Sequence, residues 1–427
     1  MRNPSYILTV LLLAMICAVN GQSVTGPRQS FVSPQLVSTI DGAILLAPDG
    51  SLWLWGGNHR QNLNPGCLGT TEVTGVPERF GSEHDWRGVA ADFMHALALK
   101  ADGSLWGWGR NYSGQLARPA STDLVPTPTQ IGPETDWAQI SVGAGHCLAL
   151  KTNGSLWGWG QNDCGQVGDG TTNNAFSPKM IGSANDWKAI AAGAFSSYAL
   201  KRDHSLWGWG GGDSNRHQEF TIGSALHGSP PCRIDPGTDW VSVSVGDSFV
   251  LALKADGTIW IGGHNARSVV RQESIPASGE PLTRVGEGKN WAELFAGAGS
   301  FFARKSDGRF FACGHNACRQ LGLDIDGLVG APERVFIDFD TWAFATGYGN
   351  TLLLTKQGKL LSWGKRLGSD RYPRIIQVKQ TLNKLIDRFP FRIEPFDTKG
   401  FIIDRAPFVL WELPSKVRGQ VREGVGK

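Results

Sequence analysis

Two short segments of the chain hold residue types that could do chemistry. The segment 313–318 reads Cys-Gly-His-Asn-Ala-Cys and places three soft or borderline metal ligands within six residues, as in a zinc or redox element. The segment 246–249 reads Gly-Asp-Ser-Phe and superficially resembles the nucleophile motif of lipases, in which a serine lies on a sharp strand-to-helix turn. Either chemistry requires elements that would hold these side chains in the necessary geometry.

A sequence repeat explains both segments more economically. A tight turn followed by Leu-Trp-x-Trp-Gly, or a variant of it, returns every 50 to 53 residues, with its turn at Gly50, Gly103, Gly154, His204, Gly257, Gly308 and Gly358. All but one of the 17 tryptophans occupy fixed positions of the repeat. Cys313 stands in a tryptophan position, Cys318 aligns with Cys164, and Ser248 falls within a repeated strand. We therefore expect neither a metal site nor a nucleophilic serine.

The remaining sequence offers no alternative catalytic pattern. It has no phosphate-binding loop and no His-Glu-x-x-His, and its carboxylates are scattered rather than paired. We expect a protein that is not an enzyme and that uses no cofactor and no metal.

Each repeat has the pattern of four short β-strands. In the third copy, residues 138–142 and 147–151 alternate or run apolar, and Asn153 and Gly154 then supply a hairpin turn. The next strand carries Trp157 and Trp159 on one face with glycine between them, and a proline marks the fourth strand, near 177–181, as an outer edge. Seven such units predict an all-β, seven-bladed β-propeller of about 51-residue repeats; the alternative is an open β-solenoid, whose coils are usually shorter.

Several copies resemble a known repeat family. Residues 109–116 read Gly-Arg-Asn-Tyr-Ser-Gly-Gln-Leu, residues 160–168 read Gly-Gln-Asn-Asp-Cys-Gly-Gln-Val-Gly, residues 314–322 are a weaker copy, and residues 143–150 read Gly-Ala-Gly-His-Cys-Leu-Ala-Leu. These segments resemble the signatures of the regulator of chromosome condensation family, whose members are seven-bladed propellers. The histidine of the second signature is present only as His95 and His146. The resemblance, together with the export signal described next, implies a secreted bacterial-type member.

The two ends of the chain differ from the repeats. Arg2 precedes a 13-residue apolar run, too short to cross a bilayer as a helix, so residues 1–21 are predicted as a signal peptide, with an uncleaved anchor as the alternative. A linker is expected at 22–32, the propeller at 33–380 and an accessory tail at 381–427. The tail has many large apolar residues, including a strand near 408–411, and is expected to pack across the propeller seam or to form a degenerate extra unit.

The charge of the chain limits the classes of molecule that it is expected to bind. Lys and Arg number 41 against 38 Asp and Glu, a balance too even for binding nucleic acid through its phosphates. No membrane span is expected after signal removal, and the protein is expected to be a secreted or periplasmic monomer.

Six cysteines of the mature chain permit up to three disulfides in an oxidising compartment, with the pairing left open: Cys67, Cys147, Cys164, Cys232, Cys313 and Cys318.

The expected function is an exported scaffold or inhibitor that grips a protein partner through propeller loops. Secreted bacterial propellers of the family that this chain resembles include an inhibitor of β-lactamases that uses aromatic residues of its loops. The resemblance therefore supports the expected function. The candidate contact residues lie in the loops after the Trp-Gly strands: Asn58, His59, Arg60, Arg110, Asn111, Tyr112, Gln161, Asp213, Asn215, Arg216 and His264. The alternatives are a carbohydrate- or envelope-binding lectin and a guanine-nucleotide exchange factor, although the uniform intervals leave no room for the inserted wedge that exchange uses. A light-sensing role is not expected, because the chain lacks the Gly-Trp-Arg-His-Thr repeats of the photoreceptor members.

Overall fold

The computed structural model describes residues 32–40, 42–56, 74–92, 94–211, 228–263, 265–272, 282–337, 340–356, 358–364 and 409–412. The predicted signal peptide, all but the last residue of the predicted linker and most of the predicted tail lie outside these ranges.

The described chain forms seven four-stranded antiparallel sheets, each with its strands in sequence order. The first three sheets are β1 (Gln35–Ser38), β2 (Gly42–Leu46), β3 (Leu52–Gly56), β4 (Thr74–Phe80); β5 (Trp86–Ala91), β6 (His95–Lys100), β7 (Leu105–Asn111), β8 (Ser121–Gln130); and β9 (Trp137–Val142), β10 (His146–Lys151), β11 (Leu156–Gly160), β12 (Ala175–Met180). The fourth and fifth are β13 (Trp187–Ala192), β14 (Ser196–Lys201), β15 (Leu206–Gly210), β16 (Cys232–Arg233); and β17 (Trp240–Val245), β18 (Val250–Lys254), β19 (Ile259–Gly262), β20 (Thr283–Arg284), with a helical turn α1 (Ala266–Val269) between the last two strands. The last two are β21 (Trp291–Ala296), β22 (Ser300–Lys305), β23 (Phe310–His315), β24 (Leu328–Val335); and β25 (Thr341–Thr346), β26 (Asn350–Thr355), β27 (Lys359–Gly364), β28 (Val409–Glu412).

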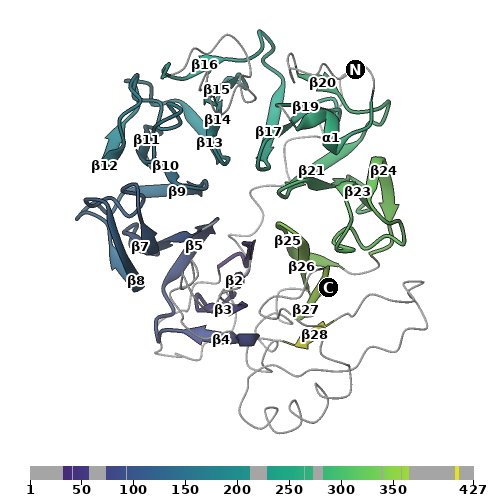
Figure 1. The fold of residues 1–427 in the computed structure, drawn as a ribbon, viewed down its shortest axis with the longest axis horizontal. Helices are drawn as coiled ribbons and strands as arrows, with labels where there is room; N and C mark the ends of the chain where they lie inside the picture. Colours follow the sequence, from purple (N-terminus) through teal and green to yellow (C-terminus); the bar gives the residue numbers. More distant parts are fainter. Residues whose placement is uncertain are drawn as a thin grey trace, which may run out of the picture. The chain divides into compact units, whose positions relative to one another are not determined.

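The sheets are the blades of a propeller, as the sequence predicts. The first strand of each blade is the innermost, and each inner strand contacts the inner strands of the two neighbouring blades, with β25 of the seventh blade against β1 of the first (Figure 1). Ser38 on β1 donates a 2.9 Å hydrogen bond to Oδ1 of Asn350 on β26, so the ring closes through side chains as well as strands.

The outer strand of the seventh blade comes from the C-terminal segment. β28 pairs with β27 from Lys359 opposite Glu412 to Ser362 opposite Val409. The strand predicted near 408–411 is confirmed, and its place is the outer edge of the last blade (Figure 1).

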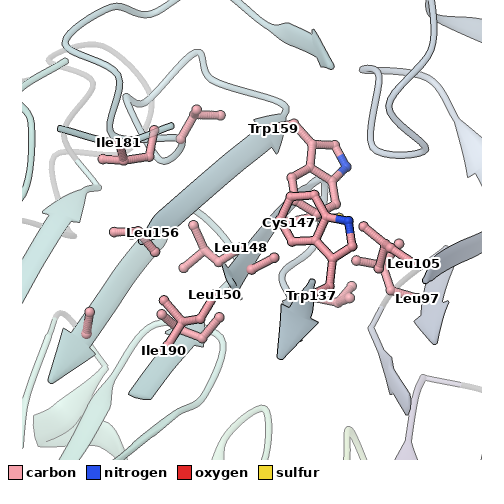
Figure 2. Packing of buried hydrophobic residues seen from close by; sticks show 14 of the residues in the cluster. Leu97, Leu105, Trp137, Cys147, Leu148, Leu150, Leu156, Trp159, Ile181 and Ile190 are labelled. Carbon is pink, nitrogen blue, oxygen red and sulfur yellow. The ribbon is translucent and has the colours of Figure 1, made fainter. Parts of the chain in front are cut away.

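The hydrophobic core lies between the faces of neighbouring blades. Leu97 of the second blade, Trp159 of the third and Ile190 of the fourth belong to one buried cluster (Figure 2). The glycine between the two indoles lies against a loop of its own blade: a Cβ on Gly158 would lie 2.7 Å from the carbonyl oxygen of Val167. The sequence predicts closely packed sheets from this glycine, whereas the contact that excludes a side chain here is with the loop that follows β11.

In the first five blades the turn between the second and third strands is fixed by a repeated set of hydrogen bonds. In the second blade Oδ1 of Asp102 accepts from both N and Oγ of Ser104, and the Ser104 hydroxyl accepts from Nε1 of Trp106 at 2.8 Å. The turn residue itself needs a positive φ, and even His204, which replaces glycine in the fourth blade, has φ of 65°. The sequence of this turn therefore specifies its local structure.

A lysine cage lies directly before this turn in the second to sixth blades. In the third blade, Nζ of Lys151 lies 4.8 Å from the Trp137 ring centroid, 4.7 Å from that of Trp157 and 3.0 Å from Oδ1 of Asp136. The two indoles meet edge to face with their centroids 5.6 Å apart. The caging lysines are Lys100, Lys151, Lys201, Lys254 and Lys305, and in the sixth blade Phe311 replaces the second indole.

Candidate functional site

The two faces of the propeller are built differently. We call the face with the lysine cages and the hairpin turns between second and third strands, such as 152–155, the hairpin face. The opposite face, the loop face, carries the turns that follow the inner strands, such as 143–145, and the loops that follow the third strands, such as 161–174. The hairpin face repeats one design, whereas the loop face varies from blade to blade, and variable loops on a rigid scaffold are where binding sites usually occur.

Asparagine and glutamine side chains shape the loops of the second, third and sixth blades. Asn111 accepts a hydrogen bond from the Leu116 amide at its Oδ1 and donates to the carbonyls of Arg118 and Pro119 from its Nδ2. Asn162 and Asn316 make the equivalent bonds in their own loops. Gln115 accepts from the Ser113 amide in the same way as Gln166 and Gln320 accept from the residues two before them. The family-like loop signature thus encodes loop shape.

The same three glutamines connect each loop to the next blade. Their main-chain carbonyls accept hydrogen bonds from an indole, a hydroxyl or a thiol of the following blade. The bonds are Trp159 Nε1 and Cys147 Sγ to Gln115 O (2.9 and 3.4 Å), Trp209 Nε1 and Ser197 Oγ to Gln166 O (3.0 and 2.7 Å), and Thr351 Oγ1 to Gln320 O (2.8 Å). Cys147 therefore has a polar role in a blade interface, and it is a free thiol, as are Cys232, Cys313 and Cys318.

His95 and His146 extend these interfaces. Both are fully buried, and Nε2 of His146 lies 2.8 Å from Oγ of Ser197 while Nε2 of His95 lies 3.1 Å from Sγ of Cys147. Because Ser197 donates its proton to Gln166, His146 must donate to Ser197 from its Nε2. Burial lowers the pKa of each histidine to about 3. The two histidines act as packing and hydrogen-bonding groups between blades.

Four of the predicted contact residues are described, and they have different environments. Asn111 is 1% exposed and Arg110 is 7% exposed, with Nη1 of Arg110 donating to the Thr122 carbonyl at 2.7 Å. Asn111 and Arg110 therefore offer little exposed side-chain surface to a partner. Tyr112 is 36% exposed, and Gln161 is partly exposed, with its Nε2 donating to Asp163.

The other predicted contact residues lie outside the described residues. They are Asn58, His59, Arg60, Asp213, Asn215, Arg216 and His264.

An exposed aromatic pair occupies the loop face where the second and third blades meet. Phe176, at the start of β12, is 46% exposed, and its ring lies against the backbone of Gly114, two residues after Tyr112. The guanidinium carbon of Arg110 lies 5.5 Å from the Tyr112 ring centroid, beneath the exposed ring. We call Tyr112 and Phe176 the aromatic patch. The sequence singled out Tyr112 and missed Phe176, whose proximity depends on the loop of the preceding blade.

A cavity of about 280 Å³ opens in the centre of the ring, where the inner strands end at the loop face. All seven inner strands or the turns after them contribute to its lining, which includes Asp92, Asp247 and Tyr348. The Tyr348 hydroxyl donates a 2.7 Å hydrogen bond to Oδ1 of Asp247, joining the seventh blade to the fifth. Burial raises the pKa of Asp247, and burial together with nearby Asp92 raises that of Tyr348. In the sequence, residues 246–249 stand out only as a nucleophile-like segment, and the part that Asp247 takes in this cavity is not predicted.

Other chemistry finds little support in the geometry. Across the ranges given above, no group of three or more His, Cys, Asp or Glu side chains could hold a metal ion. The partly exposed indoles Trp106, Trp157, Trp207 and Trp260 each have a caging lysine over the ring, so they are poor platforms for stacking a sugar. Among the helices of the described residues, none is long and apolar enough to span a membrane.

Comparison with known proteins identifies the repeats. The profile described as "Regulator of chromosome condensation (RCC1) repeat" matches residues 102–150 and 153–200, and a second profile with this description matches 137–166. The Arabidopsis thaliana protein "Ultraviolet-B receptor UVR8" is 31% identical over 166 residues, which are 35% of this chain and 37% of the receptor. "Protein RCC2 homolog" of Xenopus laevis is 30% identical over 159 residues, 35% of this chain and 30% of that protein.

The chain thus spans about a third of the length of these two curated relatives. A longer match, 26% identical over 352 residues, covers 80% of this chain and 68% of "RCC1 domain-containing protein RUG3, mitochondrial" of Arabidopsis thaliana. The named relatives are eukaryotic, and the secreted bacterial-type membership stays a prediction.

Solved structures agree on the fold. Prp20p of Saccharomyces cerevisiae, described with binding to Gsp1p and histones, superposes with a TM-score of 0.64 at 17% identity, covering 93% of this chain and 96% of that one. Human WBSCR16 gives a TM-score of 0.63 at 18% identity, covering 75% and 86%. The chain is a seven-bladed β-propeller that carries regulator of chromosome condensation repeats.

Proposed function

We propose that this chain is an exported protein-interaction scaffold that binds its partner through the loop face and catalyses no reaction. The aromatic patch is the observation that carries the proposal. Tyr112 and Phe176 project from a loop and a strand that are held by buried hydrogen bonds, so a partner would meet large rings already fixed in place. Rigid aromatic side chains at low entropic cost are typical of the residues that dominate binding energy in interfaces.

The division of the propeller into two faces supports the same function. The lysine cages and turn hydrogen bonds of the hairpin face repeat in most blades, which is the pattern of a structural framework. On the loop face, blade interfaces use the buried histidines and the loop glutamines, and the outward residues differ between copies. Regulator of chromosome condensation propellers that bind proteins, such as Prp20p with Gsp1p and histones, show that this fold is suited to such a role.

The test compares two aromatic substitutions with a matched control. The full chain and the double variant Tyr112→Ala/Phe176→Ala would be used as bait in the extracellular fraction of the native source. Phe336→Ala is the control, because Phe336 is 60% exposed but follows β24 at its hairpin-face end. We expect one or more proteins to be retained by the parent and the control and to bind the double variant at least tenfold more weakly, since interface aromatics often contribute about 2 kcal/mol or more each.

Equal retention by all three baits would refute the aromatic patch as the binding surface. The exported location has a separate test, the mass of the chain recovered outside the cell, which should lack residues 1–21. A chain found only inside the cell, with those residues attached, would refute export without affecting the binding test.

A further inference from the structure

Arg110 is a nearly buried cation without an acidic partner. It is 7% exposed, its Nη1 donates to the Thr122 carbonyl, and its guanidinium carbon lies 5.5 Å from the Tyr112 ring centroid. Within the described part of the chain, no carboxylate forms an ion pair with it. Arginine side chains are almost never fully buried unless they are paired. The charge of Arg110 is therefore unbalanced in the protein by itself.

The nitrogen atoms of Arg110 indicate where an anion would bind. Nε is covered and has no hydrogen-bond partner among the described residues. Nη2 also lacks a partner among them, but it is not a covered atom, so a ligand can reach it. Although Arg110 exposes little surface, a carboxylate needs to reach only this nitrogen. Charge-assisted hydrogen bonds between guanidinium and carboxylate groups are among the strongest that proteins form.

Charged residues in the corresponding loops of the third and sixth blades have partners within their own blade. In the third blade, Nζ of Lys179 lies 2.6 Å from Oδ2 of Asp169. In the sixth blade, Arg319 pairs with Asp324 at 2.8 Å and with Asp326 at 3.0 Å. The loop design shared by these blades therefore does not itself require an unpaired arginine.

The loop of the second blade lacks such partners. Residues 110–120 contain Arg110 and Arg118 but no aspartate or glutamate. Arg118, like Arg110, forms no ion pair in the ranges that the structure describes. Asp123 on β8 is the next acidic residue along the chain, and it pairs with neither arginine. Two uncompensated positive charges thus belong to the loop that carries Tyr112.

We propose that the protein partner of the aromatic patch presents an aspartate or glutamate to Arg110 and Arg118, beside an apolar or aromatic residue that packs on Tyr112 and Phe176. This inference rests on the proposed function and adds the chemistry of the partner. The partner's carboxylate neutralises the guanidinium that burial leaves unpaired, and the neighbouring rings shield the pair from water. Complementary charges in such a setting favour the correct partner and exclude others.

The test uses two synthetic peptides of nearly the same shape. Acetyl-Phe-Glu-Phe-amide carries a carboxylate between two aromatic rings, and acetyl-Phe-Gln-Phe-amide is its neutral match. Each is titrated into the purified full chain, with binding followed by calorimetry and by the NMR signal of the Arg110 Nε–H group. We expect the acidic peptide to bind about tenfold more tightly than the neutral one, and the preference to fall as salt is added.

Three variants assign this preference to residues. Arg110→Gln removes the charge and suits the fold, because Gln161 stands at the equivalent position of the third blade. It should abolish the preference for the acidic peptide, and Arg118→Gln should reduce the preference about threefold. Arg267→Gln is the control and should keep the full preference, because it removes the same charge from an exposed position of α1 on the loop face.

The Tyr112→Ala/Phe176→Ala variant separates this inference from the proposed function. It should weaken the binding of both peptides, which tests the aromatic patch, whereas the preference between the peptides tests the arginines alone. Inorganic phosphate is a further probe: it should compete with the acidic peptide only weakly. Phosphate that binds as tightly as the acidic peptide would mean that the site takes free anions, contrary to the proposal.

The proposal is also overturned if neither peptide binds, if both bind the parent equally well, or if Arg110→Gln and Arg118→Gln keep the parental preference. Melting curves identify any variant that has lost its fold. If Arg110→Gln unfolds, Arg118→Gln still decides the outcome.

Discussion

At the scale of the residue, the lysine cage shows how a charged side chain becomes part of a core. Lys151 is only 11% exposed, with two indoles around its Nζ and Asp136 beside it. The first and seventh blades have Ala47 and Thr355 at the equivalent position and still form sheets, so one cage is not essential for the fold. The cage should therefore contribute to stability in a measurable but moderate degree.

We predict that Lys151→Met lowers the free energy of unfolding by about 1 to 2 kcal/mol. Methionine keeps most of the volume but loses the cation over two rings and the partner of Asp136, interactions that contribute about 1 kcal/mol each when partly shielded from solvent. Urea denaturation measures the change. Lys188→Met, which removes the same charge from an exposed position on β13, is the control. Equal stabilities of the two variants would show that the cage contributes nothing.

The buried histidines make stability depend on pH. Their pKa in the folded protein, about 3, lies below the value of about 6.5 for an unfolded histidine, so the unfolded chain binds more protons between these values. Folding stability is then constant above about pH 6.5 and is lost as the pH falls below it, by about 1.4 kcal/mol per pH unit for each histidine. The lowered pKa values of Asp102, Asp203 and Asp256 act only in more acid solution.

We therefore predict that His146→Asn reduces the loss of stability between pH 6.5 and pH 5. Asparagine already occupies the equivalent position in the seventh blade as Asn350, so it fits this slot of the repeat. Denaturant unfolding at a series of pH values gives the slope for the parent and the variant. An unchanged slope would mean that His146 is protonated in the folded protein, contrary to its burial.

At the scale of the element, the strands could be predicted because each is specified locally. The turn at Gly154, the indole of Trp157 on β11 and the proline of β12 are specified within one blade, so the sequence contains the information for them. The aromatic patch could not be predicted in full, because Phe176 of one blade reaches its position against Gly114 of another. Asp247 and Tyr348 meet across the ring at a separation of 101 residues. Three of the other five repeat copies have alanine where these two residues stand, and the polar replacements were the one signal available.

The loop signature illustrates a second reason why the candidate site could be predicted only in part from the sequence. The loops at Asn111 and Asn162 share a sequence pattern, and the structure shows that these asparagines hold their loops from within. The prediction that Asn111 contacts a partner treated a loop position as an exposed one. Asn111 is buried because its side-chain amide bonds to carbonyls of its own loop. A prediction made one residue at a time does not include such bonds.

At the scale of the whole molecule, the last blade depends on a strand that arrives from far along the chain. The first blade contributes all four of its strands from residues 35–80, so the seam between the first and seventh blades lacks an exchanged strand. The seventh blade is completed by β28, which gives β27 its outer neighbour. Without β28, β27 would present an open edge of main-chain donors and acceptors, a surface that pairs readily with other chains.

We predict that a chain ending at residue 408 is less stable than the parent by about 1 to 3 kcal/mol, in the range of a substantial local loss, and that it self-associates. A chain ending at residue 412 keeps β28 and should match the parent in both respects, so the two truncations differ by the strand alone. Thermal unfolding and size-exclusion chromatography measure the two effects. Equal behaviour of both truncated chains would mean that the pairing of β27 with β28 adds no stability, and that contacts such as Ser38 with Asn350 suffice to close the ring.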